Sequence, residues 1–109
     1  MKFILLICSL LFLHSCYESQ QQIHTKLIKP KITITDIHIG KYSRVHGYFD
    51  YDGVRFIVSN PPSQGYYYKR FNLVCGQTIE QPILLYYFRD GANVVIQCSH
   101  LDVKSYQHN

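Results

Sequence analysis

Two Asp-Gly steps, at Asp52-Gly53 and Asp90-Gly91, constrain the fold of this chain more than any other feature. Each step separates two runs that are rich in β-branched and aromatic residues. Glycine accepts a positive φ at little cost, so an Asp-Gly step in this setting predicts the turn of a β-hairpin. The chain is therefore expected to be built from antiparallel strands.

The apolar pattern supports the same conclusion. Ile32 and Ile34 alternate with polar residues, and the alternation resumes at Ile37 after a slip of one position at Asp36. Alternation with period two indicates a half-buried strand, and a slip of one residue is typical of a β-bulge. The composition includes ten Tyr and six Phe, and no helical period is visible. About six short strands are expected, which favours a β-sandwich or a small barrel.

The same periodicity predicts which side chains form the core. One face of each expected strand should be buried, and a one-residue error in phase would expose that face instead. The predicted buried set is Ile32, Ile34, Val54 or Phe56, Phe71, Leu73, Leu85, Tyr87, Val94 and Ile96.

Residues 66–75 are predicted to form one strand that carries an aromatic and basic face. Alternation would place Tyr66, Tyr68 and Arg70 on the same side, with Tyr67 and Phe71 pointing inward. Tyr and Arg are enriched at protein interfaces, so these three residues are the candidate binding surface. The alternative is that the tyrosines only cover a sheet and pack against other strands.

The N-terminus predicts export. Lys2 precedes a short apolar run at 3–13, and the small Ser15 follows. That run is typical of a secretory signal and is too short for a transmembrane helix. The expected organisation is a signal peptide at 1–15, a polar tether at 16–31, a β-sandwich domain at 32–104 and a C-terminal tail at 105–109. Residues 13–16 also resemble a bacterial lipobox, in which Cys16 would be lipidated.

Three cysteines remain after removal of the signal: Cys16, Cys75 and Cys98. Export places them in an oxidising compartment, so Cys75 and Cys98 are expected to form a disulfide. The alternative is that Cys75 and Cys98 are free thiols. If Cys75 and Cys98 are paired, Cys16 is left over and available for lipidation or for an intermolecular disulfide that links a homodimer.

The sequence offers no catalytic constellation, and we expect neither an enzyme nor a cofactor. His38 and His46 are candidates to meet across a hairpin, but two more metal ligands cannot be named, so no metal site is expected. The formal net charge is +4, with the basic residues scattered singly. Nucleic-acid binding requires a basic stripe, so no nucleic-acid partner is expected either.

The segments 72–75 (NLVC) and 91–99 (GANVVIQCS), together with a Met-Lys-Phe signal and a β-only domain, resemble the small immunoglobulin-like accessory proteins of coronaviruses. The resemblance covers residues 66–104 and the overall plan of the chain. It implies a small immunoglobulin-like β-sandwich of about six to eight short antiparallel strands. It also implies secretion, or residence in the lumen of the host endoplasmic reticulum, and binding to host immune or cell-surface proteins. The chain departs from that family in having fewer cysteines and no Trp.

The sequence therefore leaves two alternative functions. The first is a secreted binding protein of viral origin that engages host proteins. The second is a lipid-anchored bacterial envelope lipoprotein with a structural or adhesion role, in which Cys16 carries the lipid.

Overall fold

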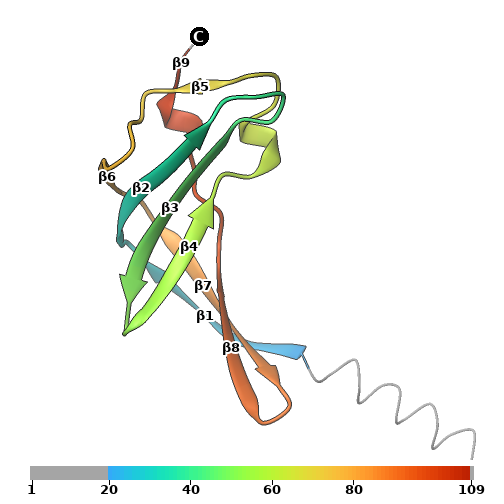
Figure 1. Cartoon of the computed structure of the whole chain (residues 1–109). Coiled ribbons are helices and arrows are strands. Elements are labelled where there is room, and N and C mark those ends of the chain that lie inside the picture. The colour runs from blue at the N-terminus through green and yellow to red at the C-terminus, as the bar shows by residue number, and fades with distance from the viewer. Residues whose placement is uncertain (1–19, 109) are drawn as a thin grey trace, which may run out of the picture. The chain divides into compact units, whose positions relative to one another are not determined.

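The computed structural model describes residues 20–108 (Figure 1). The predicted signal peptide at 1–15, its cleavage site and Cys16 lie outside the described residues. The elements follow one another as β1 (Gln20–Ile28), β2 (Lys31–His38), β3 (Arg44–Tyr51), β4 (Val54–Ser59), η1 (Pro62–Gln64), β5 (Arg70–Phe71), β6 (Thr78–Glu80), β7 (Ile83–Asp90), β8 (Asn93–Cys98), η2 (Lys104–Tyr106) and β9 (Gln107–His108).

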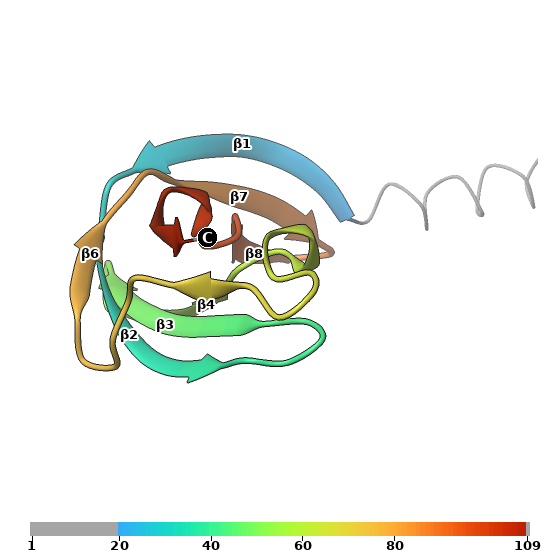
Figure 2. The same ribbon diagram turned by 90° about the horizontal axis from the view of Figure 1, so that it is seen from above.

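The strands form three antiparallel sheets, and the predicted fold class, a small all-β sandwich, is confirmed. One sheet has the order β4-β3-β2-β6, the second β1-β7-β8, and the third is the pair β5-β9. Figure 2 shows β2 and β3 side by side, with β6 at one end of the same sheet. The described residues include two 3-10 turns and no α-helix. They also include no helix with the length and apolar character that a membrane crossing requires.

The chain divides into two compact units. The smaller unit holds residues 20–25 and Tyr86–Gln97, which are parts of β1, β7 and β8. The larger unit holds Lys26–Leu85 and residues 98–108, and it contains the whole four-stranded sheet.

Both predicted hairpins and the predicted bulge are confirmed, although the second turn lies at 91–92 rather than at Asp90-Gly91. Asp52 and Gly53 have φ angles of 52° and 77°, the positive pair that a tight two-residue turn between β3 and β4 requires. Gly91, with φ 61°, begins the turn between β7 and β8. The register of β2 against β3 shifts between Ile34 and Asp36, which places the bulge where the apolar phase slips.

The core of the larger unit comes from the inward faces of its strands. Ile32, Ile34, Phe56, Phe71, Leu73 and Leu85 are buried as predicted, and Tyr87 in the smaller unit is half-buried. The remaining buried apolar side chains are Val45, Phe49, Val58, Ile79, Ile83, Leu101 and Val103.

The prediction that Val94 and Ile96 are buried is wrong, because 55% and 37% of their surfaces are exposed. Val95, which has the opposite phase, is also 39% exposed, so no shift of register would bury this strand. Alternation predicted a strand here correctly, but it does not reveal whether a second layer covers either face.

Three segments differ from the sequence prediction. The predicted tether contains β1, which pairs with β7. The predicted tail contains β9, in which Gln107 lies opposite Phe71. Within 66–75 only Arg70–Phe71 forms a strand, since the residues before it turn sharply.

Candidate binding surface

Two loops of the larger unit are held together by their backbones. One connects β2 to β3, and the other follows η1. Tyr42 and Tyr66 form an isolated antiparallel bridge. The amide of Tyr67 donates to the carbonyl of Lys41 at 2.9 Å, and the amide of Ser43 donates to the carbonyl of Gly65 at 2.7 Å. These contacts fix the second loop against the first.

Gly65 is required for this approach. A Cβ atom at that position would overlap the carbonyl oxygen of Ser43, and the three nearest atoms all belong to the Ser43 backbone, which cannot rotate away as a side chain could. Glycine is the residue that lets two backbones come this close.

An exposed aromatic cluster results. The ring of Tyr66 contacts the ring of Tyr42 edge to face at a centroid distance of 5.1 Å, and that of Tyr67 at 4.1 Å. Tyr67 and Tyr68 are 68% and 64% exposed, although aromatic side chains of this size usually bury much of their surface. The cluster therefore presents a broad apolar area to solvent.

Tyr67 and Tyr68 both adopt the left-handed backbone conformation, with φ angles of 62° and 57°. This conformation costs a non-glycine residue about 1–2 kcal/mol, and such residues are concentrated at ligand clamps and active sites. Two consecutive left-handed residues also reverse the chain, so alternation cannot apply here. The prediction that Tyr67 points inward is wrong for this reason, whereas Phe71 is buried as predicted.

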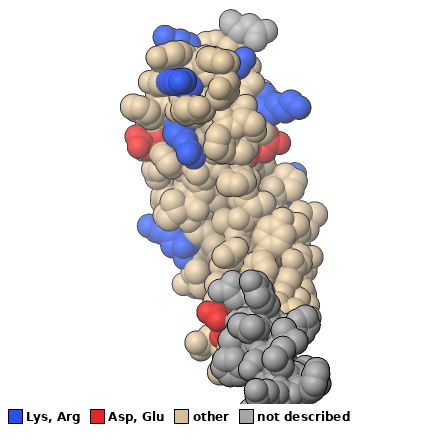
Figure 3. Space-filling model, turned by 90° about the vertical axis from the view of Figure 1, so that its right-hand side faces the viewer, with Lys and Arg blue, Asp and Glu red and all other residues tan. Residues whose placement is uncertain are grey.

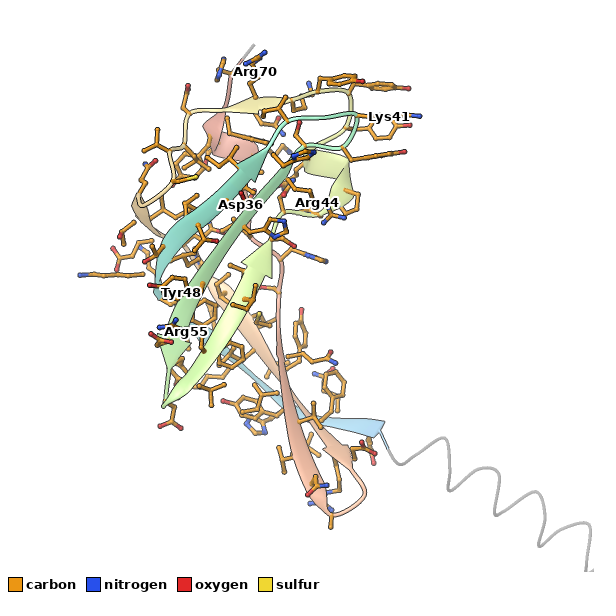
Figure 4. The ribbon with its side chains drawn as sticks, in the orientation of Figure 1. Asp36, Lys41, Arg44, Tyr48, Arg55 and Arg70 are labelled. Carbon is orange, nitrogen blue, oxygen red and sulfur yellow. The ribbon has the colours of Figure 1, made fainter. Side chains whose placement is uncertain are left out.

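Basic residues flank the tyrosines in the sequence. Lys41, Lys69 and Arg70 are exposed, and the Lys41 ammonium lies 6.0 Å from the centroid of the Tyr42 ring. Neither 37–49 nor 53–79 contains an Asp or Glu. In Figure 4, Lys41 and Arg70 lie toward the same end of the larger unit, and Asp36 lies farther along the sheet. On the face shown in Figure 3, Lys and Arg side chains gather toward the upper end.

We call this area the tyrosine surface and define it as Lys41, Tyr42, Tyr66, Tyr67, Tyr68, Lys69 and Arg70. It includes all three residues of the predicted binding surface, Tyr66, Tyr68 and Arg70, and each of them is exposed. Sequence reasoning missed Lys41 and Tyr42, because they belong to a polar turn more than 20 positions away and only the tertiary contacts bring them here.

The predicted disulfide is wrong, because Cys75 and Cys98 are free cysteines in this structure. Cys75 is exposed in the turn before β6, at the edge of the four-stranded sheet, whereas Cys98 is half-buried at the end of β8, in a different sheet. The prediction assumed a continuous strand up to Cys75, and the turn at Tyr67 and Tyr68 removes that strand. Burial raises the pKa of the Cys98 thiol.

His38 and His46 come from paired strands but lie opposite other residues, Arg44 and Asp36 respectively. In the described part of the chain, no three His, Cys, Asp or Glu side chains gather as metal ligands would.

The β3-β4 hairpin carries an exposed ion pair whose charged side chains satisfy each other. The guanidinium of Arg55 donates to both carboxylate oxygens of Asp50, at 2.9 and 3.2 Å, and lies 4.2 Å from the centroid of the Tyr48 ring. Figure 4 shows Tyr48 and Arg55 as neighbours. The hydrogen bonds from Arg55 lower the pKa of Asp50. This arrangement is a cross-strand pair that supports the hairpin.

Comparison of the chain with protein-family models, with curated proteins and with solved structures finds no match.

Proposed function

We propose that this chain is an exported, non-enzymatic binding protein that uses the tyrosine surface to contact a partner protein with an acidic surface. The observation that carries the proposal is the pair of exposed tyrosines, Tyr67 and Tyr68, in left-handed backbone conformations. Backbone hydrogen bonds from Tyr67 to Lys41 and from Ser43 to Gly65 fix the loops that bear them.

The tyrosine surface has the properties of a protein interface. Tyrosine supplies a large, rigid contact area and loses little conformational entropy on binding. Because the loops are already fixed, little further ordering is needed when a partner arrives.

The surrounding charge indicates the chemistry of the partner. Lys41, Lys69 and Arg70 are exposed and flank the tyrosines in the sequence, and the loop segments that form the surface contain no carboxylate. Complementary charge mainly increases the association rate and excludes wrong partners. A protein that presents Asp or Glu around an apolar centre fits this surface best.

The signal sequence and the family resemblance support a cellular location and a class of partner. We propose that the chain is secreted or resides in the lumen of the secretory pathway, and that its partners are immune or cell-surface proteins of a host. The intact mass of the exported chain tests the proposed location. A mass that matches an unmodified chain beginning near Cys16 supports secretion, whereas a diacyl addition on Cys16 favours a lipid-anchored envelope protein.

Substitution of the tyrosine surface tests its role. The double variant Tyr68→Ala, Arg70→Ala should fold normally, since surface changes typically alter stability by about ±0.5 kcal/mol. Binding to cell-surface proteins captured by the wild type should weaken by about 2 kcal/mol or more if either residue is an anchor. Leu27→Ala with Lys29→Ala is the matched control, because Leu27 is 68% exposed and Lys29 is an exposed cation in the same unit.

The alternative role, in which the tyrosines only cover the sheet, gives the opposite result. The tyrosine variant would then melt at a lower temperature and still bind the same proteins as the control. That outcome would show that the tyrosine surface is not the binding site.

A further inference from the structure

Strand β8 is an open sheet edge with exposed apolar side chains. It is the last strand in the order β1-β7-β8, so one side of its backbone has no neighbouring strand in that sheet. Val94, Val95 and Ile96 are 55%, 39% and 37% exposed. Successive side chains of a strand point to opposite faces, so each face of β8 presents aliphatic side chains to solvent, Val94 and Ile96 on one face and Val95 on the other.

The other outer strands of the two larger sheets carry features that discourage pairing with another chain. β4 carries the exposed Arg55, β6 has only three residues, and β1 contains Lys26 and is followed closely by Pro30. Charges, prolines and short length are the usual protection of sheet edges. β8 is six residues long and contains no charged residue, proline or glycine. An unprotected edge among protected ones indicates a strand that is covered in the working protein.

The sequence of β8 indicates what covers it. From Asn93 to Gln97 the residues read amide, aliphatic, aliphatic, aliphatic, amide, which is symmetric about Val95. If two copies pair antiparallel about Val95, each Val94 faces the partner copy's position 96, and each Asn93 faces its position 97. Residues directly opposite in an antiparallel pair share a face, so aliphatic groups meet aliphatic groups and amides meet amides.

We propose that β8 pairs antiparallel with β8 of a second copy of this chain, with the two-fold axis passing through Val95. A two-fold contact of this kind requires a self-complementary strand without charge, because a charged side chain on the axis would face its own copy, and one beside the axis would face an aliphatic or amide side chain. The edge amides and carbonyls of each β8 then bond those of the other, and the two three-stranded sheets join into one. The contact is separate from the tyrosine surface and does not depend on the proposed function.

The test uses the exported chain in a thiol reductant, so that no disulfide contributes to association, with molar mass measured by sedimentation equilibrium. The wild type should shift from monomer to dimer as its concentration rises. Val95→Lys and Val95→Glu should each remain monomeric, because like charges would face each other across the axis. An equimolar mixture of the two variants should recover the dimer, since an ammonium then faces a carboxylate.

Val74→Lys is the matched control, because Val74 is 66% exposed in a turn outside β8, and it should dimerise like the wild type. A wild type that remains monomeric, a Val95→Lys variant that still dimerises, or a mixture that does not recover the dimer would each overturn the proposal. If the Val95 variants do not fold, hydrogen exchange on the wild type decides instead. The β8 amides should exchange more slowly as concentration rises, and a rate independent of concentration would contradict the pairing.

Discussion

The side chain of Gln81 bonds the backbone of Asp102 as a paired strand would. Its Oε1 accepts from the amide of Asp102 at 2.7 Å, and its Nε2 donates to the carbonyl of Asp102 at 2.8 Å. Gln81 is buried, and Asp102 lies between the core residues Leu101 and Val103. One glutamine thus satisfies both polar groups of a residue that joins no sheet, and it holds the C-terminal segment in the larger unit.

Gln81→Leu should destabilise the fold, because the amide and the carbonyl of Asp102 both lose their partners. An orphaned buried group costs about 1–3 kcal/mol, and because both bonds are only part-buried we expect a loss of unfolding free energy toward the lower end of that range. Denaturant unfolding measures it. Gln22→Leu is the control, since Gln22 is exposed in β1 and should change stability little. Equal stability of the two variants would mean that water replaces the glutamine without cost.

Asn60 plays a comparable role at the end of β4. Its fully buried side chain accepts from the amide of Val45 at 2.8 Å and donates to the carbonyl of Ser43 at 3.1 Å. Asn60→Leu removes both bonds, at about 1–3 kcal/mol for each group left unpaired. Because Ser43 also bonds Gly65, the variant should in addition loosen the tyrosine surface. The melting temperature should fall, whereas Asn72→Leu, at an exposed position, should leave it unchanged.

Local chemistry made the hairpins and the bulge predictable. The positive φ at Gly53 and the phase slip at Asp36 each depend only on residues that are close together in the sequence. The alternating strands β2 and β4 could be predicted for the same reason, since burial on one face leaves a pattern of period two.

The parts that were not predicted depend on distant partners. β1 is exposed at nearly every described side chain, so it carries no burial pattern and exists as a strand through pairing with β7. β9 pairs with β5 from more than 30 positions away. The turn at Tyr67 depends on a bond to Lys41, and no local rule favours tyrosine in a left-handed conformation. The sequence could thus identify the surface tyrosines but not their arrangement.

The ion pair between Asp50 and Arg55 should make the hairpin sensitive to acid. Hydrogen bonds from Arg55 lower the pKa of Asp50 below the ordinary 3.8. A carboxyl with a lower pKa in the folded state stabilises that state above the unfolded pKa, and the contribution is lost as pH falls through the folded pKa. NMR titration should therefore give Asp50 a midpoint below 3.8, and Arg55→Gln should raise it. An unchanged midpoint in Arg55→Gln would show that the pair does not persist in solution.

The two free cysteines should differ in reactivity. The thiolate is the reactive form, and burial raises the pKa of Cys98 while also limiting access to its sulfur. Cys75 is exposed. Alkylation at neutral pH, followed by peptide mass analysis, should label Cys75 well before Cys98. Recovery of a peptide pair linked through Cys75 and Cys98 would instead show that the exported protein forms the disulfide, and that the segments around these two cysteines are arranged differently from this structure.

Replacing the strained tyrosines with glycine should separate stability from binding. Glycine adopts a positive φ without steric cost, although it also gains entropy in the unfolded chain, so Tyr67→Gly and Tyr68→Gly should keep or modestly raise the unfolding free energy. Val at either position should lower it, because a β-branched residue is strained at φ near 60°. If the tyrosine surface is the binding site, the glycine variants should lose partner binding while remaining stable, since the contact area of the ring is gone. Thermal melts and binding measured on the same preparations compare the two properties. Glycine variants that are less stable than the wild type would mean that the tyrosine rings stabilise the fold, and the strain would then have a structural explanation rather than a functional one.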